Sequence, residues 1–243
     1  MLGVNFFWKC RCNKMLAFEE LIKIRGRQYL EQGELHISGM DPVMDSKFKL
    51  GEVAAAAHAS VGVAINDIWE LKTGRRQKIQ VSIGSAAASL KSNKFIKIRH
   101  RNGDFHNLVD KDHEFNRHLN GVYRTKDGGW VLPHFGLNHL RDRMLGLLGA
   151  DPDQLSVSKA VAKWNAIDLE NAIAQKNLCG GMVRTNSEWL AEPHGKVLSS
   201  KPVVEVIKIG PSEPEPIPIG NRPLSGGKVL DLTRILAGPI AAR

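Results

Sequence analysis

The sequence predicts an α/β fold, namely part of a large α/β domain into which a smaller α+β domain is inserted. An alanine-rich helical pattern over Gly51–Leu71 is followed by an alternating strand pattern over Gln77–Ile83. A hairpin pattern over Tyr123–Leu132 then precedes several short helical patterns. Near the end of the chain, an apolar stretch over Lys228–Leu232 leads through small residues into the beginning of another helix.

The helical pattern over Gly51–Leu71 is the strongest local signal. Gly74 lies just beyond basic Lys72 and predicts where this helix ends, because glycine readily adopts the left-handed conformation of a C-terminal cap. Apolar side chains recur at helical spacing and predict one buried face. That predicted face consists of Val53, Ala57, Val61, Ala64, Ile65 and Ile68.

Shorter patterns surround this helix. Phe18–Ile24 is amphipathic, and Asp41-Pro42 marks a turn. The stretch Gln77–Ile83 alternates polar and apolar residues, which predicts a strand, and Ala86–Leu90 predicts a further helix. A helix, strand and helix in this order are typical of an α/β core.

The second unit begins with the hairpin pattern over Tyr123–Leu132. Its turn, Lys126-Asp127-Gly128-Gly129, has the residues that tight hairpin turns require. We expect the tryptophans of this unit, Trp130, Trp164 and Trp189, to lie in its core. Helices are predicted at Leu137–Leu148, Ser156–Lys163, Ile167–Lys176 and Ser187–Leu190.

The last forty residues predict a strand, a linker and the beginning of a new α/β unit. Val203–Ile209 reads as a strand, and Pro211–Pro223 contains five prolines, typical of an extended linker or of a strap over a surface. After the Lys228–Leu232 strand, Pro239 suits the first turn of a helix. Such a strand–turn–helix unit can hold a phosphate-bearing ligand. Because a parallel strand needs a crossover helix to cover it, we expect the chain to be a piece of a longer protein.

The composition of the 243 residues is that of a globular protein, with 42% hydrophobic and 24% charged residues. No apolar run is long enough for a transmembrane helix. The net charge is +9, and one dense basic cluster comprises Lys91, Lys94, Lys97, Arg99, His100 and Arg101. Ile96 and Ile98 alternate within this cluster like a buried strand, so a solvated basic face is preferred to nucleic-acid binding. Attraction of an anionic small molecule is the third interpretation.

The N-terminal residues and the cysteines bear on location and metals. Residues 1–14 contain no carboxylate, which suits either an organelle-targeting segment or a poorly ordered leader before Met15. Cys10 and Cys12 lack a second ligand pair at zinc spacing, and Cys179 reads as a small buried residue rather than a catalytic thiol. His134 and His139 are five residues apart, so they do not share a helix face, and no metal site is predicted.

Several of these segments together resemble the class III (CaiB/BaiF type) CoA-transferase family. The segments, taken in chain order, are Leu71-Lys-Thr-Gly-Arg-Arg-Gln-Lys-Ile-Gln-Val-Ser-Ile83, Gly121-Val-Tyr-Arg-Thr-Lys-Asp-Gly-Gly-Trp130, Ala174-Gln-Lys-Asn-Leu-Cys-Gly-Gly-Met-Val183 with Glu188-Trp-Leu-Ala-Glu-Pro-His194, and Lys228-Val-Leu-Asp-Leu-Thr-Arg-Ile-Leu-Ala-Gly-Pro239. The first resembles the family's helix-to-strand junction and the next two its small domain. The last resembles the motif that opens its large domain.

The order of these segments implies a duplicated member of the family, of which the chain is a fragment. We expect an N-terminal leader or extension over residues 1–41 and a large-domain fragment over residues 42–105. A small domain over residues 106–200 and a proline-rich return strand and linker over residues 201–223 follow. Residues 224–243 would begin a second large-domain module.

The resemblance also implies a nucleophile. Family members use an aspartate in a Leu-Gly-Asp stretch to attack an acyl-CoA thioester, which gives an acyl–aspartyl anhydride and then an aspartyl–CoA thioester. A gapless match at Thr73-Gly74 places Leu50-Gly51-Glu52 on this stretch, so Glu52 is the candidate catalytic residue. Glutamate keeps the carboxylate but reaches one methylene further, and such chemistry tolerates little misplacement. The alternative is a structural carboxylate favoured by the helix dipole.

The resemblance further implies coenzyme A as substrate and product, with no tightly bound cofactor. The loop of the opening motif contacts CoA in the family, which makes Arg234, Ile235, Leu236 and Ala237 the candidate binding residues. Arg234 either pairs with a phosphate or is an ordinary solvated arginine. Arg76 stands where the family usually has glycine, which leaves the local turn unpredicted. Expected partners are an acyl-CoA, a small carboxylic acid and a second copy in a homodimer, with neither a membrane nor nucleic acid. We expect an intracellular protein, cytoplasmic or alternatively mitochondrial.

Three functions therefore stay open. The first is CoA transfer through Glu52. The second is a catalytically silent structural or dimerisation module of a longer protein. The third is racemase-like proton exchange beside a thioester carbonyl, which needs an acid–base pair. His58 lies six residues beyond Glu52, on a different face of the same helix, so it does not supply the partner.

Overall fold

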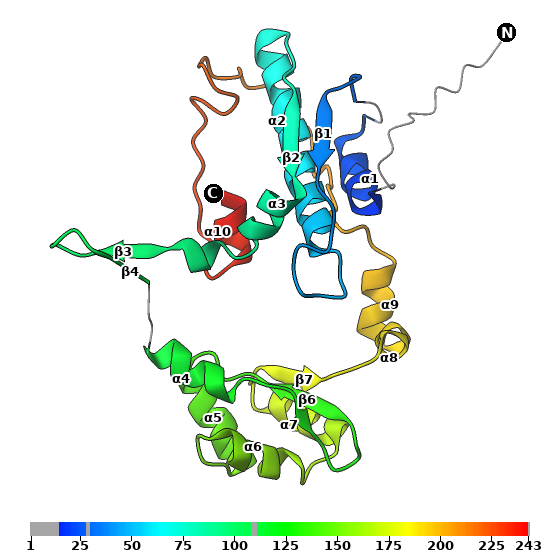
Figure 1. Ribbon diagram of the computed structural model, residues 1–243. Coiled ribbons are helices and arrows are strands. Elements are labelled where there is room, and N and C mark those ends of the chain that lie inside the picture. The colour runs from blue at the N-terminus through cyan, green and yellow to red at the C-terminus, as the bar shows by residue number, and fades with distance from the viewer. Residues whose placement is uncertain (1–14, 28–29, 108–110, 243) are drawn as a thin grey trace. The chain divides into compact units, whose positions relative to one another are not determined.

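The computed structural model describes residues 15–27, 30–107 and 111–242. They form two compact units, one from the chain up to Lys94 together with Pro202 onward, the other from Phe95–Lys201 (Figure 1). Residues 1–14 of the predicted leader or extension, with the Cys10–Cys12 pair, lie outside the described residues. Within the described ranges, no helix combines the length and the hydropathy needed to cross a bilayer.

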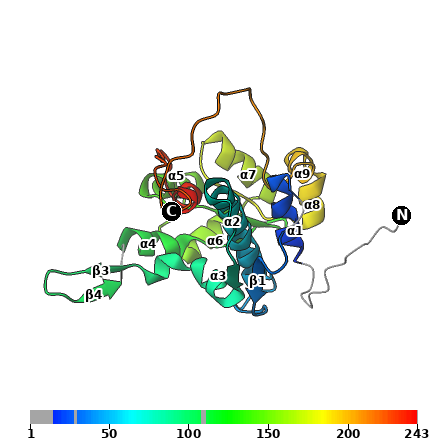
Figure 2. The ribbon, with the colours of Figure 1, turned by 90° about the horizontal axis from the view of Figure 1, so that it is seen from above.

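The first unit is built around the 24-residue helix α2, Leu50–Thr73. Helices α1 (Leu16–Ile22) and α3 (Ile83–Ser89) pack against it, as do strands β1 (Leu35–Ser38) and β2 (Ile79–Ser82) (Figure 2). β1 and β2 pair in parallel, with Leu35 opposite Ile79 and Ser38 opposite Ser82. The turn η1 (Lys23–Arg25) follows α1. This arrangement confirms the predicted α/β core, and Gly74 ends α2 at φ 68° as expected.

The predicted buried face of α2 was wrong. Val53 is 56% exposed and Val61 is 58% exposed, whereas Ala55, Ala56 and Ala59 are fully buried. Small side chains let α1 and α3 approach α2 closely, so close helix packing selected the alanine face rather than the face with the larger apolar residues. A row of larger apolar side chains therefore remains on the outside of α2.

The second unit is a three-stranded antiparallel sheet covered by helices. Its strands are β5 (Tyr123–Arg124), β6 (Trp130–Pro133) and β7 (Gly180–Met182), in the order β5-β6-β7. The hairpin and all four predicted helices are confirmed. The helices of this unit are α4 (Lys111–Leu119), α5 (Asn138–Leu148), α6 (Gln154–Val161), α7 (Ala166–Gln175), α8 (Asn186–Ala191) and α9 (Pro193–Ser199).

The core of the second unit draws on its sheet and on α5, α6 and α7. Trp164 packs against this core as predicted, but Trp130 is 44% exposed, and Cys179, predicted to be buried, is exposed. Trp130 lies on the outer face of β6, because alternate strand residues point to opposite faces and its neighbour Val131 points inward. The core residues are Leu119, Tyr123, Val131, Phe135, Met144, Leu148, Val157, Ala160, Val161, Ala166, Leu169 and Ile173.

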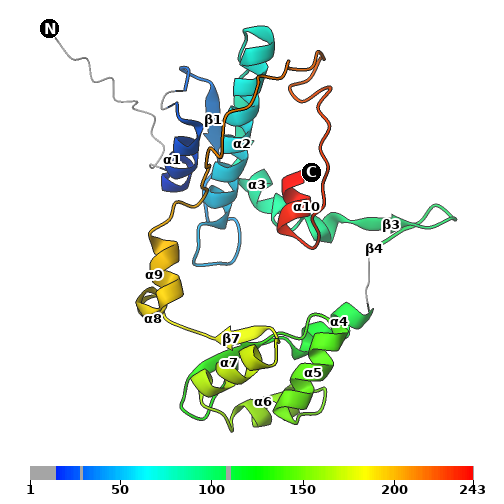
Figure 3. The ribbon, with the colours of Figure 1, turned by 180° about the vertical axis from the view of Figure 1, so that it is seen from behind.

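A separate hairpin precedes this sheet. After the turn η2 (Ser92–Phe95), β3 (Lys97–Arg99) pairs antiparallel with β4 (Phe105–Asn107), and no third described strand joins them (Figure 3). The prediction of a buried strand was wrong here, since Ile96 and Ile98 are each 45% exposed. A two-stranded hairpin without a covering layer leaves both of its faces in solvent.

Two predicted strands in the last part of the chain are not formed. Residues 203–209 and 228–232 have no regular secondary structure, and no described strand pairs with them. Ile209 is fully exposed, and Val229 is 86% exposed. A strand needs a neighbour for its N–H and C=O groups, which sequence pattern alone does not supply. Pro239 lies in the first turn of α10 (Ala237–Ala242), as predicted.

Candidate functional site

Glu52 lies in the first turn of α2, on the side of the helix that packs against the rest of its unit. Only 22% of its side chain is exposed. Its carboxylate oxygens lie 3.1 and 3.3 Å from Nζ of Lys49. The Glu52 carboxylate is therefore paired with a surface lysine, while part of the side chain remains in solvent.

The N-terminal end of α2 is capped by a carboxylate from outside the helix. Asp41 Oδ2 accepts a hydrogen bond from the Glu52 N–H (2.7 Å), and Asp41 Oδ1 accepts from the N–H groups of Gly51 and Val43 (3.2 Å each). Partial burial alone would raise the pKa of Asp41, but these three N–H donors hold that pKa below its ordinary value. The first-turn N–H groups of Gly51 and Glu52 are thus satisfied by the protein itself.

Gly51 is required by close packing at this point. A Cβ at residue 51 would lie 2.7 Å from Asp41 Oδ1, from Ile83 Cγ2 and from Val43 Cγ2. These atoms belong to two segments, the loop of Asp41 and Val43 and the beginning of α3, which converge on the beginning of α2. Close packing therefore favours glycine at residue 51, independently of any resemblance, and the carboxylate of Glu52 follows it directly.

Other groups near α2 do not add an acid–base partner for Glu52. His58 bonds instead to Ser89, with 2.9 Å between Nε2 and Oγ. No cluster of metal-ligating side chains occurs among the residues that the structure describes. Lys49 is the one group to which a hydrogen bond or ion pair joins the Glu52 carboxylate within the described ranges.

The second set of predicted site residues, Arg234, Ile235, Leu236 and Ala237, lies in the loop that leads into α10. Ile235 adopts a positive φ of 76° and is 76% exposed, and Leu236 is 67% exposed. The loop is shaped by Asp231, which accepts hydrogen bonds from the N–H and hydroxyl of Thr233. In the described part of the chain, no hydrogen bond or ion pair joins this loop to Glu52.

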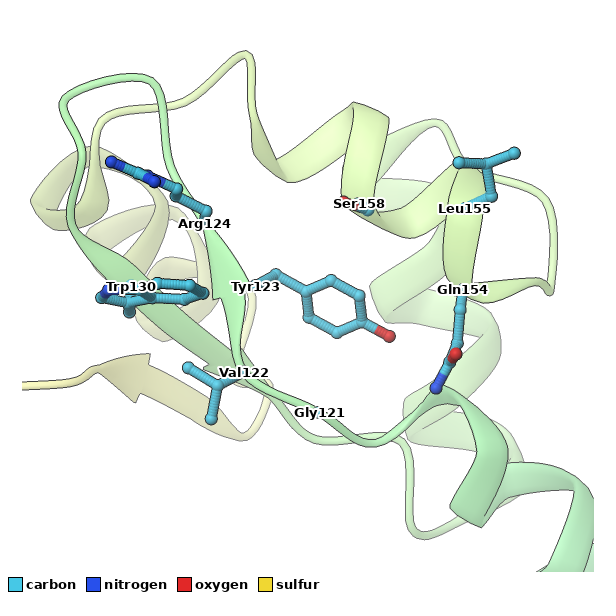
Figure 4. Close-up of a pocket in the computed structure, with 8 residues that line it drawn as sticks. All are labelled: Gly121, Val122, Tyr123, Arg124, Trp130, Gln154, Leu155 and Ser158. Atoms are coloured by element: carbon cyan, nitrogen blue, oxygen red, sulfur yellow. The ribbon is translucent and has the colours of Figure 1, made fainter.

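A pocket lies in the second unit and was not foreseen from the sequence (Figure 4). It has a volume of about 500 Å³ and runs between the β5 end of the sheet and the beginning of α6. Tyr123 is fixed within it, because its hydroxyl donates to the Leu119 carbonyl at 2.6 Å. Arg124 lies over the Trp130 ring, 5.9 Å from its centroid. Glu52 does not line this pocket. The residues that line it are Gly121, Val122, Tyr123, Arg124, Trp130, Gln154, Leu155 and Ser158.

Arg76, which occupies the position of an expected glycine, is the centre of a buried ion network. Its guanidinium binds the carboxylates of Glu34, Asp67 and Glu70, and its side chain is only 6% exposed. Arg25 also binds Asp67. Hydrogen bonds from Arg25 and Arg76 lower the pKa of Asp67, and those from Arg76 and Asn66 lower the pKa of Glu34 against the effect of its burial. No local sequence pattern signals the whole network, because Glu34 lies 42 positions from Arg76 and Arg25 lies 42 positions from Asp67.

Comparison with known proteins identifies the relatives of this chain. Residues 29–208 match the family model of CoA-transferase family III. The chain is 31% identical over 153 residues to an acyl-CoA transferase of Gibberella moniliformis, covering 54% of this chain and 26% of that protein. It is 29% identical over 143 residues to the acetyl-coenzyme A transferase nodX of Hypoxylon pulicicidum, covering 51% and 24%. The chain thus spans about a quarter of the length of these curated relatives.

Two solved structures are similar to part of this chain. One is Rv3272 of Mycobacterium tuberculosis, with a TM-score of 0.48 and 14% identity over 74% of this chain and 51% of that one. Another is a CAIB/BAIF family protein from Brucella suis, with a TM-score of 0.45 and 15% identity over 72% and 50%. The family model matches well over half of the chain, so the chain belongs to CoA-transferase family III.

Proposed function

We propose that Glu52 is the carboxylate nucleophile of a CoA-transferase that moves CoA between an acyl-CoA thioester and a small carboxylic acid. The position of Glu52 carries this proposal. Its side chain is 22% exposed, its carboxylate pairs with Lys49, and it directly follows Gly51, where an added Cβ would lie 2.7 Å from three side-chain atoms. Membership of the family and the names of the two fungal relatives support the reaction class.

The reaction proceeds through two anhydrides and one thioester on the protein. A Glu52 oxygen attacks the thioester carbonyl carbon, the C–S bond breaks, and CoA leaves as the thiolate. The thiolate then attacks the glutamyl carbonyl carbon of the mixed anhydride, which releases the first carboxylic acid and leaves a glutamyl–CoA thioester. The acceptor carboxylate attacks the glutamyl carbonyl carbon of that thioester, which releases the CoA thiolate and forms the second mixed anhydride. The thiolate then attacks the acceptor carbonyl carbon of this anhydride, which gives the new acyl-CoA. This last step regenerates Glu52.

Neighbouring residues have separate parts in this proposal. Lys49 orients the Glu52 carboxylate and offsets negative charge that develops on the thioester oxygen. Asp41 keeps the first turn of α2 in place through its backbone hydrogen bonds. The loop of Arg234, Ile235, Leu236 and Ala237 approaches CoA through backbone N–H groups, and a homodimer of the longer protein is the proposed assembly.

A second function is favoured by a specific observation. Two pockets lie within the second unit, and Glu52 lines neither of them. A catalytically silent module that supports an active part of a longer protein would have this property. Racemase-like exchange has less support, since Lys49 rather than a histidine faces Glu52.

An isotope-exchange assay tests the proposal. The chain is incubated with acetyl-CoA and labelled acetate, and the label that enters the thioester is measured. Glu52→Gln removes the nucleophile but keeps the shape, so exchange should fall by about a hundredfold or more, whereas Glu52→Asp should keep part of it. Glu19→Gln, an exposed glutamate in the first turn of α1, is the matched control. Equal exchange by wild type and Glu52→Gln would overturn Glu52 as the nucleophile, and no exchange by wild type would favour the silent module.

A further inference from the structure

The hairpin of β3 and β4 separates its side chains into two different faces. Residues opposite each other in an antiparallel pair share a face, so Arg99 lies with Phe105 and Lys97 lies with Asn107. The other face carries Ile98 and His106, and the His106 ring meets the His100 ring edge-on, with centroids 4.5 Å apart. One face is therefore basic and aromatic, and the other is aliphatic with imidazoles.

The basic and aromatic face is open to solvent. Phe105 is 62% exposed, and Phe95, which flanks the hairpin, is 67% exposed. The Arg99 guanidinium carbon lies 6.0 Å from the Phe105 ring centroid, within the range of a cation–π contact. Phe95 and Phe105 are therefore accessible to a ligand, and Phe105 lies next to an arginine.

The cations of the hairpin have no carboxylate partners. No ion pair to Lys97, Arg99 or Arg101 occurs among the described residues. The one carboxylate in the hairpin, Asp104, accepts from the side chain of Asn102 at 2.7 Å and so belongs to the turn. The positive charge of this face is thus available to an outside anion.

We propose that the basic and aromatic face of this hairpin, defined by Phe95, Lys97, Arg99 and Phe105, binds single-stranded nucleic acid. Unpaired bases stack on exposed rings, while lysine and arginine beside those rings meet the phosphates. The isoleucines that suggested a buried strand are exposed on the hairpin, so burial no longer excludes this surface. A membrane surface fits less well, because the tip of the hairpin carries Asn102 and Asp104, which resist insertion into lipid.

Fluorescence anisotropy with a short labelled oligothymidylate tests this proposal on the whole chain. Phe95→Ala with Phe105→Ala should weaken binding by about tenfold or more, since stacked bases contribute strongly in such complexes. Lys97→Gln with Arg99→Gln should weaken binding and also reduce the slope of log K against log salt by about 1.4, as expected for two lost phosphate contacts.

Two control variants separate this face from general effects. Ile96→Ala with Ile98→Ala changes the same hairpin away from the proposed face and should leave affinity unchanged. Lys159→Gln with Lys163→Gln removes the same charge from exposed sites elsewhere in the second unit and should change affinity less than threefold, by about 0.6 kcal/mol.

Three results would overturn the proposal. They are affinity that is unchanged in both face variants, binding to phosphatidylserine vesicles without binding to the oligonucleotide, and competition by CoA at equal phosphate concentration. Competition of that kind would mean a mononucleotide site rather than a nucleic-acid site. The assay does not depend on Glu52, so the transferase proposal can fail or hold separately.

Discussion

Gly51 makes a residue-scale prediction, because its environment leaves no space for a side chain. Gly51→Ala places a Cβ 2.7 Å from Asp41, Val43 and Ile83, so it should destabilise the first unit by about 1–3 kcal/mol. Urea unfolding monitored by circular dichroism measures this change. Gly146→Ala is the control, since nothing lies within 4 Å of a Cβ there and alanine favours helix α5 by about 1 kcal/mol. Equal effects of the two substitutions would contradict the packing at Gly51.

The Arg76 network makes a prediction about pH. The folded-state pKa values of Glu34 and Asp67 lie below their ordinary values, so the unfolded chain takes up protons first as the pH falls. Their contribution to stability should be complete above about pH 4.5 and should be lost as the pH falls through the lowered folded-state values. Urea midpoints measured from neutral to acidic pH follow this loss.

Variants of the network supply the comparison. Arg76→Gln leaves the 2%-exposed Glu34 without its cation, and it should cost about 3 kcal/mol at neutral pH and flatten the pH dependence. Arg27→Gln removes a 59%-exposed arginine from the edge of the same network, and it should cost less than about 1 kcal/mol. Similar losses of unfolding free energy in the two variants would show that the burial of Arg76 does not increase its contribution to stability.

Residue-scale features differ in how far the sequence predicts them. Glu52 and Gly74 could be placed, because a motif and a cap are local. Asp41, Ile83 and Val43 meet at Gly51 only after the chain has folded, and Arg76 finds Glu34 from 42 positions away. Contacts between distant segments leave no local pattern, so neither feature could be foreseen.

At the scale of elements, α2 shows the limit of periodicity. Both sides of this helix are apolar, so helical spacing alone did not decide which side is buried. We predict that Ala59→Leu, on the buried side, destabilises the protein by about 1–3 kcal/mol through overpacking. Ala64→Leu, on the exposed side of the same helix, should change stability by less than about 0.5 kcal/mol. Thermal melts of the two variants measure the difference. A larger loss of stability in Ala64→Leu than in Ala59→Leu would support the buried face that was predicted from the sequence.

Elements with their own turn and cap signals were predicted well. The hairpin of β5 and β6 turns at Asp127, whose carboxylate also accepts from the Ala166 N–H and so joins the turn to the beginning of α7. Strands were predicted less well, because pairing depends on a partner. β1 escaped prediction, while the segments 203–209 and 228–232 pair with no strand among the described residues.

At the scale of the whole molecule, the two units differ in how much core they contain. The second unit has a core of twelve buried hydrophobic residues, while the largest cluster in the first has four, beside a two-stranded parallel sheet. We predict that amides of β6, α5 and α7 exchange with deuterium more slowly than those of β1 and β2. Hydrogen exchange followed by mass spectrometry measures this, and slower exchange in β1 and β2 would contradict the prediction.

The family and the α/β class were predictable because four motifs occur in family order over most of the chain. The reaction of this chain is less predictable from its sequence, because the chain spans about a quarter of the length of its curated relatives. The pocket beside β5 depends on how α6 packs, which no motif describes.

The central claim is that Glu52 becomes covalently attached during turnover, and a trapping experiment tests it most directly. The chain is incubated with acetyl-CoA and then with hydroxylamine, which converts an enzyme-bound anhydride or thioester into a hydroxamate, and its peptides are weighed by mass spectrometry. We predict a hydroxamate on the peptide that contains Glu52, absent when acetyl-CoA is omitted and absent in Glu52→Gln. An unmodified Glu52 peptide, or a hydroxamate on another carboxylate, would contradict the claim.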